Sequence, residues 1–359
     1  MTQKHSDYMH WAKTRSQARF NLATSGVGSF PLSGLKADLS RLEINGQDGY
    51  GYKPLLSAMA QHCGADPDNV VEAAGTSMAN HLAMAAILEP GDEVLIEHPT
   101  YGLLLDVAHY LRAEVKRFHR VEENAWAIDA DEIAQLVSKR TKLIVLTNLH
   151  NPTSVETPDS VLSAVGELAA TVGAHLLVDE AYRESVYDSL PQTSFHLGPN
   201  FVVTKSLTKS YGLSGLRCGW VLAAPDLAWK MRRLNDLFGA TPVHPGELLS
   251  VAAFNQLPFI REKARSAVAA DHKLLDRFFS ERSDLAVVPT SSGTTSFPRL
   301  RKRGTERFIE RLRTDFETSV VPGRFFEMPD HFRIGMGVNH EMFAEGLRRL
   351  GLALANEPS

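Results

Sequence analysis

The sequence predicts an α/β protein: a mainly parallel β-sheet between layers of helices, with a smaller α+β lobe beside it. Between about residues 70 and 222, short apolar runs alternate with segments of helical periodicity. Beyond Leu227 this alternation is replaced by long helical segments, followed by shorter strands and helices. Strands that alternate with helices are typical of a parallel sheet covered on both faces. The length of 359 residues also favours a main domain plus a smaller one.

Each element follows from its local pattern. Residues 1–20 are polar and predict an N-terminal helix or arm, and Asn45–Gly51 is rich in turn-forming residues. One-sided apolar patterns predict helices at Pro54–His62, Met78–Leu88, Tyr101–Leu111, Ala130–Val137 and Pro158–Val172. Short apolar runs predict strands at Val70–Ala74, Val94–Ile96, Val115–Phe118, Leu143–Leu146, Ala174–Val178, Phe201–Val203 and Gly219–Leu222.

The C-terminal third predicts the smaller lobe. Helices are expected up to about residue 280, and strands at Leu285–Val288, Thr294–Pro298 and Phe332–Gly335. The most basic run of the chain is Arg299–Arg313, which includes Lys302 and Arg303. Apolar residues recur there at helical spacing, so the run favours an amphipathic helix with a solvated basic face over a nucleic-acid or lipid patch.

Composition narrows the function classes. Hydrophobic residues make up 43% and charged residues 22% of the chain, and the net charge is −4. These values are ordinary for a globular protein and give no electrostatic reason to expect a nucleic-acid partner. No apolar stretch reaches the ~18 residues that a membrane span needs, so no membrane partner is expected. The only two cysteines, Cys63 and Cys218, predict reduced thiols and a cytoplasmic location.

The most informative segment runs from Ser206 to Arg217 and contains Lys209. A lysine that forms an imine needs an unprotonated amine, and a fixed positive charge nearby lowers its pKa. Hydroxyl groups and an arginine fork are what a phosphate requires. A lysine for a carbonyl together with Ser206 and Arg217 for a phosphate predicts a pocket for pyridoxal 5′-phosphate (PLP). The alternative is an exposed lysine in a loop rich in glycine and serine.

Asp179 comes directly after the apolar run that ends at Val178. A carboxylate at a strand end can pair with a protonated pyridine nitrogen. One apolar strand separates Asp179 from Lys209 in the sequence, so both groups can reach one site from neighbouring strand ends. Taken alone, Asp179 is equally suited to cap a helix N-terminus.

Weaker signals point to the same ligand. Thr76 and Ser77 open a helix, where free amides and a hydroxyl bind anions. Asn151 precedes a proline after another strand, and as a plain turn this is unremarkable. Tyr101 can stack on a flat ring or be a core residue. Arg333 lies inside an apolar strand, where it needs an anionic partner, either a substrate carboxylate or a structural salt bridge.

With these residues in view, the chain resembles the class I/II aminotransferases, which are PLP enzymes of fold type I. The resemblance runs from about Gly46 to Leu222 and again around Arg333. It implies a large PLP-binding domain over residues 46–260 and a small domain formed by residues 1–45 and 261–359. It also implies a homodimer with active sites at the interface.

The resemblance implies a role for each site residue. Lys209 is the Schiff-base lysine and proton carrier, and Asp179 binds the pyridine nitrogen. The ring hydroxyl is held by Asn151 and Tyr182, and Tyr101 stacks on the ring. The phosphate is held by Thr76, Ser77, Ser206 and Arg217. The substrate is bound by Arg333 and Asn151, and the segment Ser25–Gly28, with Gly26, closes over it.

Two positions depart from the family pattern. The family often has a tyrosine that reaches the partner subunit's phosphate, five positions before the glycine matched to Gly51. Gly46 stands there in this chain, and whether Tyr50 or Tyr52 serves instead is open. The family motif Asn-Pro-Thr-Gly reads Asn-Pro-Thr-Ser here, with Ser154 in last place.

These residues favour transamination between an L-amino acid and a 2-oxo acid, with the other PLP reactions as alternatives. The same lysine, aspartate and arginine serve elimination, cyclisation, decarboxylation and oxidation, since function depends on the rest of the site. A ligand-sensing domain of a transcription regulator is disfavoured, because the residues before Ser25 are too few for a DNA-binding region and the charge is unsuited.

Overall fold

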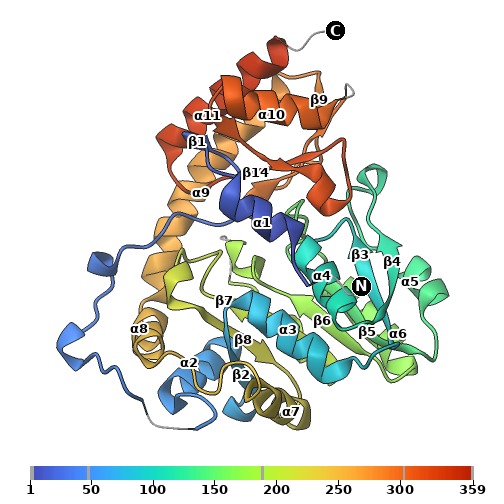
Figure 1. The fold of residues 1–359 in the computed structure, drawn as a ribbon, viewed down its shortest axis with the longest axis vertical. Helices are drawn as coiled ribbons and strands as arrows, with labels where there is room; N and C mark the ends of the chain where they lie inside the picture. The colour runs from blue at the N-terminus through green and yellow to red at the C-terminus, as the bar shows by residue number, and fades with distance from the viewer. Residues whose placement is uncertain (1–3, 47–48, 187–189, 302–303, 357–359) are drawn as a thin grey trace.

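The computed structural model describes residues 4–46, 49–186, 190–301 and 304–356. Figure 1 shows a large lobe built around a central sheet, and a smaller lobe that holds the C-terminal helices together with part of the N-terminal segment. None of the helices in these described ranges is long and apolar enough to cross a membrane.

The large lobe contains a seven-stranded sheet. Its strands are β2 (Val70–Ala74), β3 (Glu93–His98), β4 (Glu114–His119), β5 (Thr141–Thr147), β6 (His175–Asp179), β7 (Phe201–Ser206) and β8 (Cys218–Leu222). Their order is β2-β8-β7-β6-β5-β3-β4. Only β8 runs antiparallel to its neighbours. The chain between β7 and β8 covers residues 207–217, which is too short for the helical crossover that a parallel connection needs. The predicted mainly parallel sheet is therefore confirmed, with β8 as its exception.

Helices cover both faces of this sheet. They are α2 (Lys53–Cys63), α3 (Thr76–Ile87), α4 (Gly102–Tyr110), α5 (Ala130–Leu136), α6 (Asp159–Thr171), α7 (Pro225–Asn235) and α8 (His244–Phe254). Side chains of α3, α4 and α7 form one core with alternate residues of the strands, and α2, α5, α6 and α8 form the other core with the remaining ones. Because side chains of a strand point alternately to its two faces, one apolar run supplies both cores.

The smaller lobe mixes short strands with helices. Its elements are α1 (Asp7–Thr14), β1 (Phe20–Asn21), α9 (Leu257–Ser280), β9 (Leu285–Ala286), β10 (Thr295–Ser296), β11 (Arg299–Leu300), α10 (Thr305–Asp315), β12 (Thr318–Ser319), β13 (Val321–Pro322), β14 (Phe332–Gly335) and α11 (His340–Ala355). β1 pairs in parallel with β12, and Leu22 lies in the core of this lobe with α9, α10 and α11. The N-terminal segment thus joins the C-terminal part of the chain (Figure 1).

Some expected boundaries are corrected. The strands predicted at Leu285–Val288 and Thr294–Pro298 are each two residues long, because the chain between them turns away from its pairing partners. The helix expected from Arg299 to Arg313 begins only at Thr305, and Lys302 and Arg303 lie outside the described residues.

The domain boundary predicted at residue 260 falls inside α9. Ile260 packs in a core of the large lobe, whereas Leu275 packs in the core of the smaller one. One continuous helix therefore connects the two lobes, and the predicted domain limits stay a prediction.

Candidate active site

One cavity of about 370 Å³ lies beyond the carboxyl ends of β5, β6 and β7, between the two lobes. It is lined by nine of the predicted site residues: Thr76, Ser77, Tyr101, Asn151, Asp179, Tyr182, Lys209, Arg217 and Arg333. Ser206 contacts this group through Thr76, and Gly26 contacts it through Lys209. Ligands in open α/β sheets bind at this edge of the sheet. We therefore take this cavity as the candidate active site.

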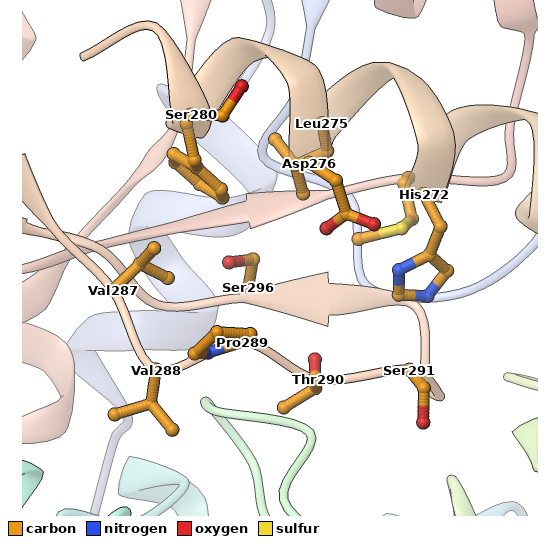
Figure 2. Close-up of a pocket in the computed structure, with 12 residues that line it drawn as sticks. His272, Leu275, Asp276, Ser280, Val287, Val288, Pro289, Thr290, Ser291 and Ser296 are labelled. Carbon is orange, nitrogen blue, oxygen red and sulfur yellow. The ribbon is translucent and has the colours of Figure 1, made fainter.

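A larger cavity, of about 670 Å³, lies in the smaller lobe between α9 and the segment that follows β9 (Figure 2). Its lining includes Leu275, Ser296 and Met336, together with the ionisable residues His272 and Asp276. No lysine or arginine lines it in the described part of the chain. Size alone does not identify an active site, and the smaller cavity is the one in which ionisable groups of opposite charge converge.

The side chain of Lys209 is half-buried and lines this cavity. Its Nζ donates a hydrogen bond to Ser25 Oγ over 2.8 Å. Burial lowers the pKa of Lys209, and the positive charges of Arg333 and Arg217 act in the same direction. A Cβ on Gly26 would lie only 2.9 Å from Lys209 Cα, so the segment after Ser25 closes tightly on the lysine because this position is a glycine. The amine is thereby prepared for reaction with a carbonyl.

The carboxyl group of Asp179 lies at the end of β6 and is also buried. Asn80 Nδ2 donates to Asp179 Oδ2 over 2.8 Å, and the N–H of Ala181 donates to Oδ1 over 2.9 Å. Thr204 Oγ1 donates in turn to Asn80 Oδ1 over 2.6 Å, which fixes the amide. Burial raises the pKa of Asp179 to about 6 despite these donors. A cationic N–H from a ligand would keep this carboxylate charged.

The first turn of α3 forms an anion cradle. Gly75 precedes it with φ +81°, and the first helical hydrogen bonds to its carbonyl come from Met78 and Ala79. The N–H groups of Thr76 and Ser77 therefore precede the helical ladder and are open to a ligand.

Arg217 closes this cradle from the other side. A Cβ on Gly75 would lie 2.4 Å from Arg217 Nη2, so only glycine admits the guanidinium there. The hydrogen bonds of Arg217 go to the carbonyls of Ala74 and Ser214, and no carboxylate among the described residues pairs with it. Ser206 Oγ accepts from Thr76 Oγ1 over 2.8 Å beside it. Amides, hydroxyls and a guanidinium together suit a phosphate.

Arg333 is completely buried in β14. Its Nη1 donates to Asn151 Oδ1 over 2.8 Å and its Nη2 to the hydroxyl of Tyr8 over 3.1 Å, while Nε makes no hydrogen bond. Within the described ranges, no carboxylate forms an ion pair with Arg333. A buried guanidinium without an anion is unfavourable unless a ligand supplies one, so the group is suited to a substrate carboxylate.

Two tyrosines complete the walls. Tyr101 follows β3, and its ring meets that of Tyr8 edge to face at 5.5 Å. Tyr182 follows β6, with Lys209 Nζ at 6.0 Å from its ring centre. Burial raises the pKa of both hydroxyls, so both remain protonated donors at neutral pH.

Ser154 has φ +63°, a conformation that glycine adopts without strain. Its Oγ lies 2.8 Å from Thr295 Oγ1 and accepts from the N–H of Thr295 over 3.3 Å. The serine thus connects the loop that carries Asn151 to β10 in the smaller lobe. This contact gives a physical reason for the departure from the glycine that is usual in the family.

Sequence reasoning missed Asn80, Thr204 and Tyr8. A signal for Asn80 existed, since a lone amide in the apolar helix Met78–Leu88 needs a partner when it is buried. Tyr8 carries no local signal, because its contact with Arg333 joins residues 325 positions apart. Tyr50 and Tyr52 do not line the cavity of their own chain; their rings contact Trp229 and His244 instead. Which of them reaches a partner subunit stays open.

The chain is similar to known proteins over most of its length. The family model described as "Aminotransferase class I and II" matches residues 36–350. The chain belongs to this family. It is 28% identical to capreomycidine synthase of Streptomyces vinaceus, over 94% of this chain and 90% of that protein.

Two solved structures extend the comparison. A PLP-dependent aminotransferase from Streptococcus suis 89-1591 has a TM-score of 0.91 and 25% identity, with all of both chains covered. The PLP-dependent cyclase OrfR has a TM-score of 0.86 and 26% identity, with 93% of this chain and 92% of that chain covered. The fold is therefore that of the fold-type I PLP enzymes, and PLP is the cofactor of this protein.

The residues present fit this cofactor. The cradle around Gly75, which Arg217 approaches closely, would suit a phosphate. Asp179, whose pKa burial raises to about 6, would gain a partner from a protonated ring nitrogen. Lys209, whose pKa burial lowers, would supply the amine. The three groups line the same cavity, so one molecule of PLP can meet all of them.

Proposed function

We propose that this protein is an aminotransferase, which moves the amino group of an L-amino acid to a 2-oxo acid. The support is one cavity in which a half-buried amine, a buried carboxyl and a guanidinium without a carboxylate partner among the described residues converge. The guanidinium carries the argument, because it selects an α-carboxylate. The similarity to the PLP-dependent aminotransferase from Streptococcus suis supports the same reaction class.

In this proposal PLP supplies the electron sink that stabilises negative charge at the substrate Cα. Arg333 and Asn151 hold the substrate carboxylate and so orient the Cα–H bond. Lys209 Nζ removes the α-proton as general base, which its lowered pKa favours, and returns it on the same face. Asp179 would pair with the ring nitrogen of the bound cofactor and stay charged. Tyr182 and Asn151 would hold its ring hydroxyl.

The test is an absorption spectrum of the purified PLP-loaded protein, recorded while single L-amino acids are added without a 2-oxo acid. We expect the visible cofactor band to disappear, with one 2-oxo acid released per active site. Lys209→Ala should abolish both the band and turnover while the fold is retained, because no other lysine lines the cavity in the described part of the chain. Full activity of Lys209→Ala would refute the proposal.

The second candidate is another PLP reaction, with cyclisation first among elimination, decarboxylation and oxidation. It is supported by the similarity to the PLP-dependent cyclase OrfR and to capreomycidine synthase. Analysis of the products formed in the same reaction separates the two candidates. A cyclised product, ammonia or carbon dioxide in place of a 2-oxo acid would establish the second candidate.

We also propose that the protein is a homodimer. Exposed apolar side chains gather on residues 32–50 and 229–243, and include Leu32, Leu39, Ile44, Trp229, Leu237 and Val243. The two segments are adjacent, because Tyr50 contacts Trp229 at 5.0 Å and Ile44 lines one cavity with Val243. A contiguous apolar surface of this kind is typical of an interface. Light scattering should give twice the mass of the chain, and Ile44→Asp with Val243→Asp should reduce it.

A cytoplasmic location is part of the proposal. Cys63 and Cys218 are both free and both buried, which is the state expected of thiols in a reducing compartment. Fractionation of the source cells, followed by detection of the protein, would test the location.

A further inference from the structure

The hydroxyl of Tyr8 occupies a distinctive position. It accepts a hydrogen bond from Arg333 Nη2 over 3.1 Å, and no described residue accepts the hydrogen of Tyr8 itself. The oxygen thus satisfies one side of the guanidinium while its own O–H remains available. Within the described residues, Arg333 Nε is a second unused donor close by. Arg333 Nε and the O–H of Tyr8 are thus two unused donors beside one buried positive charge, and together they form an incomplete anion site.

Tyr8 belongs to helix α1, which is anchored in the smaller lobe. Tyr8, Met9 and Ala12 of α1 line the cavity, and Ser16 lines it just after the helix, so one face of α1 forms a wall of the cavity. Trp11 lies elsewhere on this helix and is buried in an apolar cluster of the smaller lobe. Ser6 caps the N-terminus through the N–H of Met9.

The ring of Tyr8 is fixed by aromatic contacts. It meets Tyr101 at 5.5 Å, Phe325 at 5.6 Å and Phe326 at 6.2 Å. These contacts use only the ring, so they do not explain why this residue carries a hydroxyl. The hydroxyl serves Arg333 alone among the described residues, and it faces the same cavity as Lys209.

We propose that Tyr8 is a substrate-binding residue, which donates its hydroxyl hydrogen to the α-carboxylate that Arg333 binds. A carboxylate has two oxygens, so one can accept from Arg333 Nε and the other from Tyr8. The carboxylate then bridges Arg333 on β14 and Tyr8 on α1, which already contact each other in the structure. The hydroxyl of Tyr8 therefore favours α-amino acids over amines that lack the carboxylate. This inference rests on the proposed function for the position of the substrate, but it does not depend on which PLP reaction follows.

The test compares wild-type protein with Tyr8→Phe, which keeps every ring contact and removes only the hydroxyl. The PLP-loaded proteins are titrated with the L-amino acid that gives the largest spectral change. We expect a Kd about 10- to 100-fold higher for Tyr8→Phe, the range of a lost hydrogen bond to a charged group. The rate of the spectral change at saturation should stay within about threefold. The amine that lacks the carboxylate should bind both proteins equally.

A binding measurement without turnover gives an independent readout. Calorimetric titration with pyruvate, which carries the carboxylate but no amino group, should show the same ratio of Kd values, with or without PLP. Tyr110→Phe is the matched control, because Tyr110 is exposed on α4 and does not line the cavity. An unchanged Kd for both pyruvate and the amino acid, or an equal loss for the amine, would overturn the inference. Absence of any cofactor band in the wild type would instead refute the proposed function.

Discussion

The charges that line the cavity differ from buried charges that do not line it. Away from the cavity, Arg120 Nε lies 2.9 Å from Glu97 Oε2, and both side chains are fully buried. Lys205 Nζ lies 2.7 Å from Glu184 Oε1. Burial alone raises the pKa of Glu184, but the charge of Lys205 holds it well below its usual range. These pairs are complete without a ligand.

In the cavity the charged groups have only neutral partners. Asp179 is bonded to an amide and a backbone N–H, Arg333 to an amide and a phenol, and Lys209 to a hydroxyl. A buried charge without an opposite charge is costly, and a structural role does not require it. The contrast shows how a ligand-binding charge is distinguished from a structural one, by the missing counter-ion.

The largest expected effect comes from replacing the two fully buried arginines in turn. Arg120→Met leaves Glu97 uncompensated and should lower the free energy of unfolding by about 3–5 kcal/mol. Arg333→Met removes a charge that has no carboxylate partner, so stability should be unchanged or higher. The kcat/KM of Arg333→Met should fall by about 10²- to 10³-fold, because the substrate carboxylate loses its buried positive partner. Urea unfolding of the cofactor-free proteins measures the free energy of unfolding of each variant. Equal destabilisation by Arg120→Met and Arg333→Met would show that the two arginines do not differ in the way proposed.

The next effect is a pH dependence of stability. The pKa of Asp179 is about 6 in the folded protein and 3.8 in its reference state, so the folded protein binds this proton more tightly. The resulting stabilisation is fully present below about pH 4 and is lost as the pH rises through about 6. Its full size is about 3 kcal/mol in the free energy of unfolding. It is measured as the difference in unfolding free energy between cofactor-free wild type and Asp179→Asn from pH 4 to pH 7. A difference independent of pH would show that Asp179 is already compensated.

The smallest effect concerns Ser154, a neutral connection between the two lobes. Ser154→Gly relieves the positive φ but loses the hydrogen bonds to Thr295, so stability should change by less than about 1 kcal/mol. Ser154→Ala loses the bonds and keeps the strain, and should be about 1 kcal/mol less stable than the glycine variant. Thermal unfolding compares the two. If alanine were as stable as glycine, backbone strain at this position would be negligible.

Much of the fold and of the site follows from local sequence. Short apolar runs predict the strands, and their ends carry Asp179 and the segment before Lys209, so strand polarity alone brings these groups to one edge of the sheet. The direction of β8 was not predicted, because the pattern of a buried strand is the same in both directions. Two expected strands were too long, since apolar residues continue past the point where pairing ends.

What the sequence by itself determined is the chemistry: a lysine, a carboxylate and an arginine, each close to residues that reveal its environment. Only the tertiary structure decided which charges are left without a counter-ion. Arg333 gains Tyr8 and Asn151 from 325 and 182 positions away, and Asp179 gains Asn80 from 99 positions away. The physical reason is that pairing depends on distance in space, whereas spacing along the chain constrains only neighbours within one element.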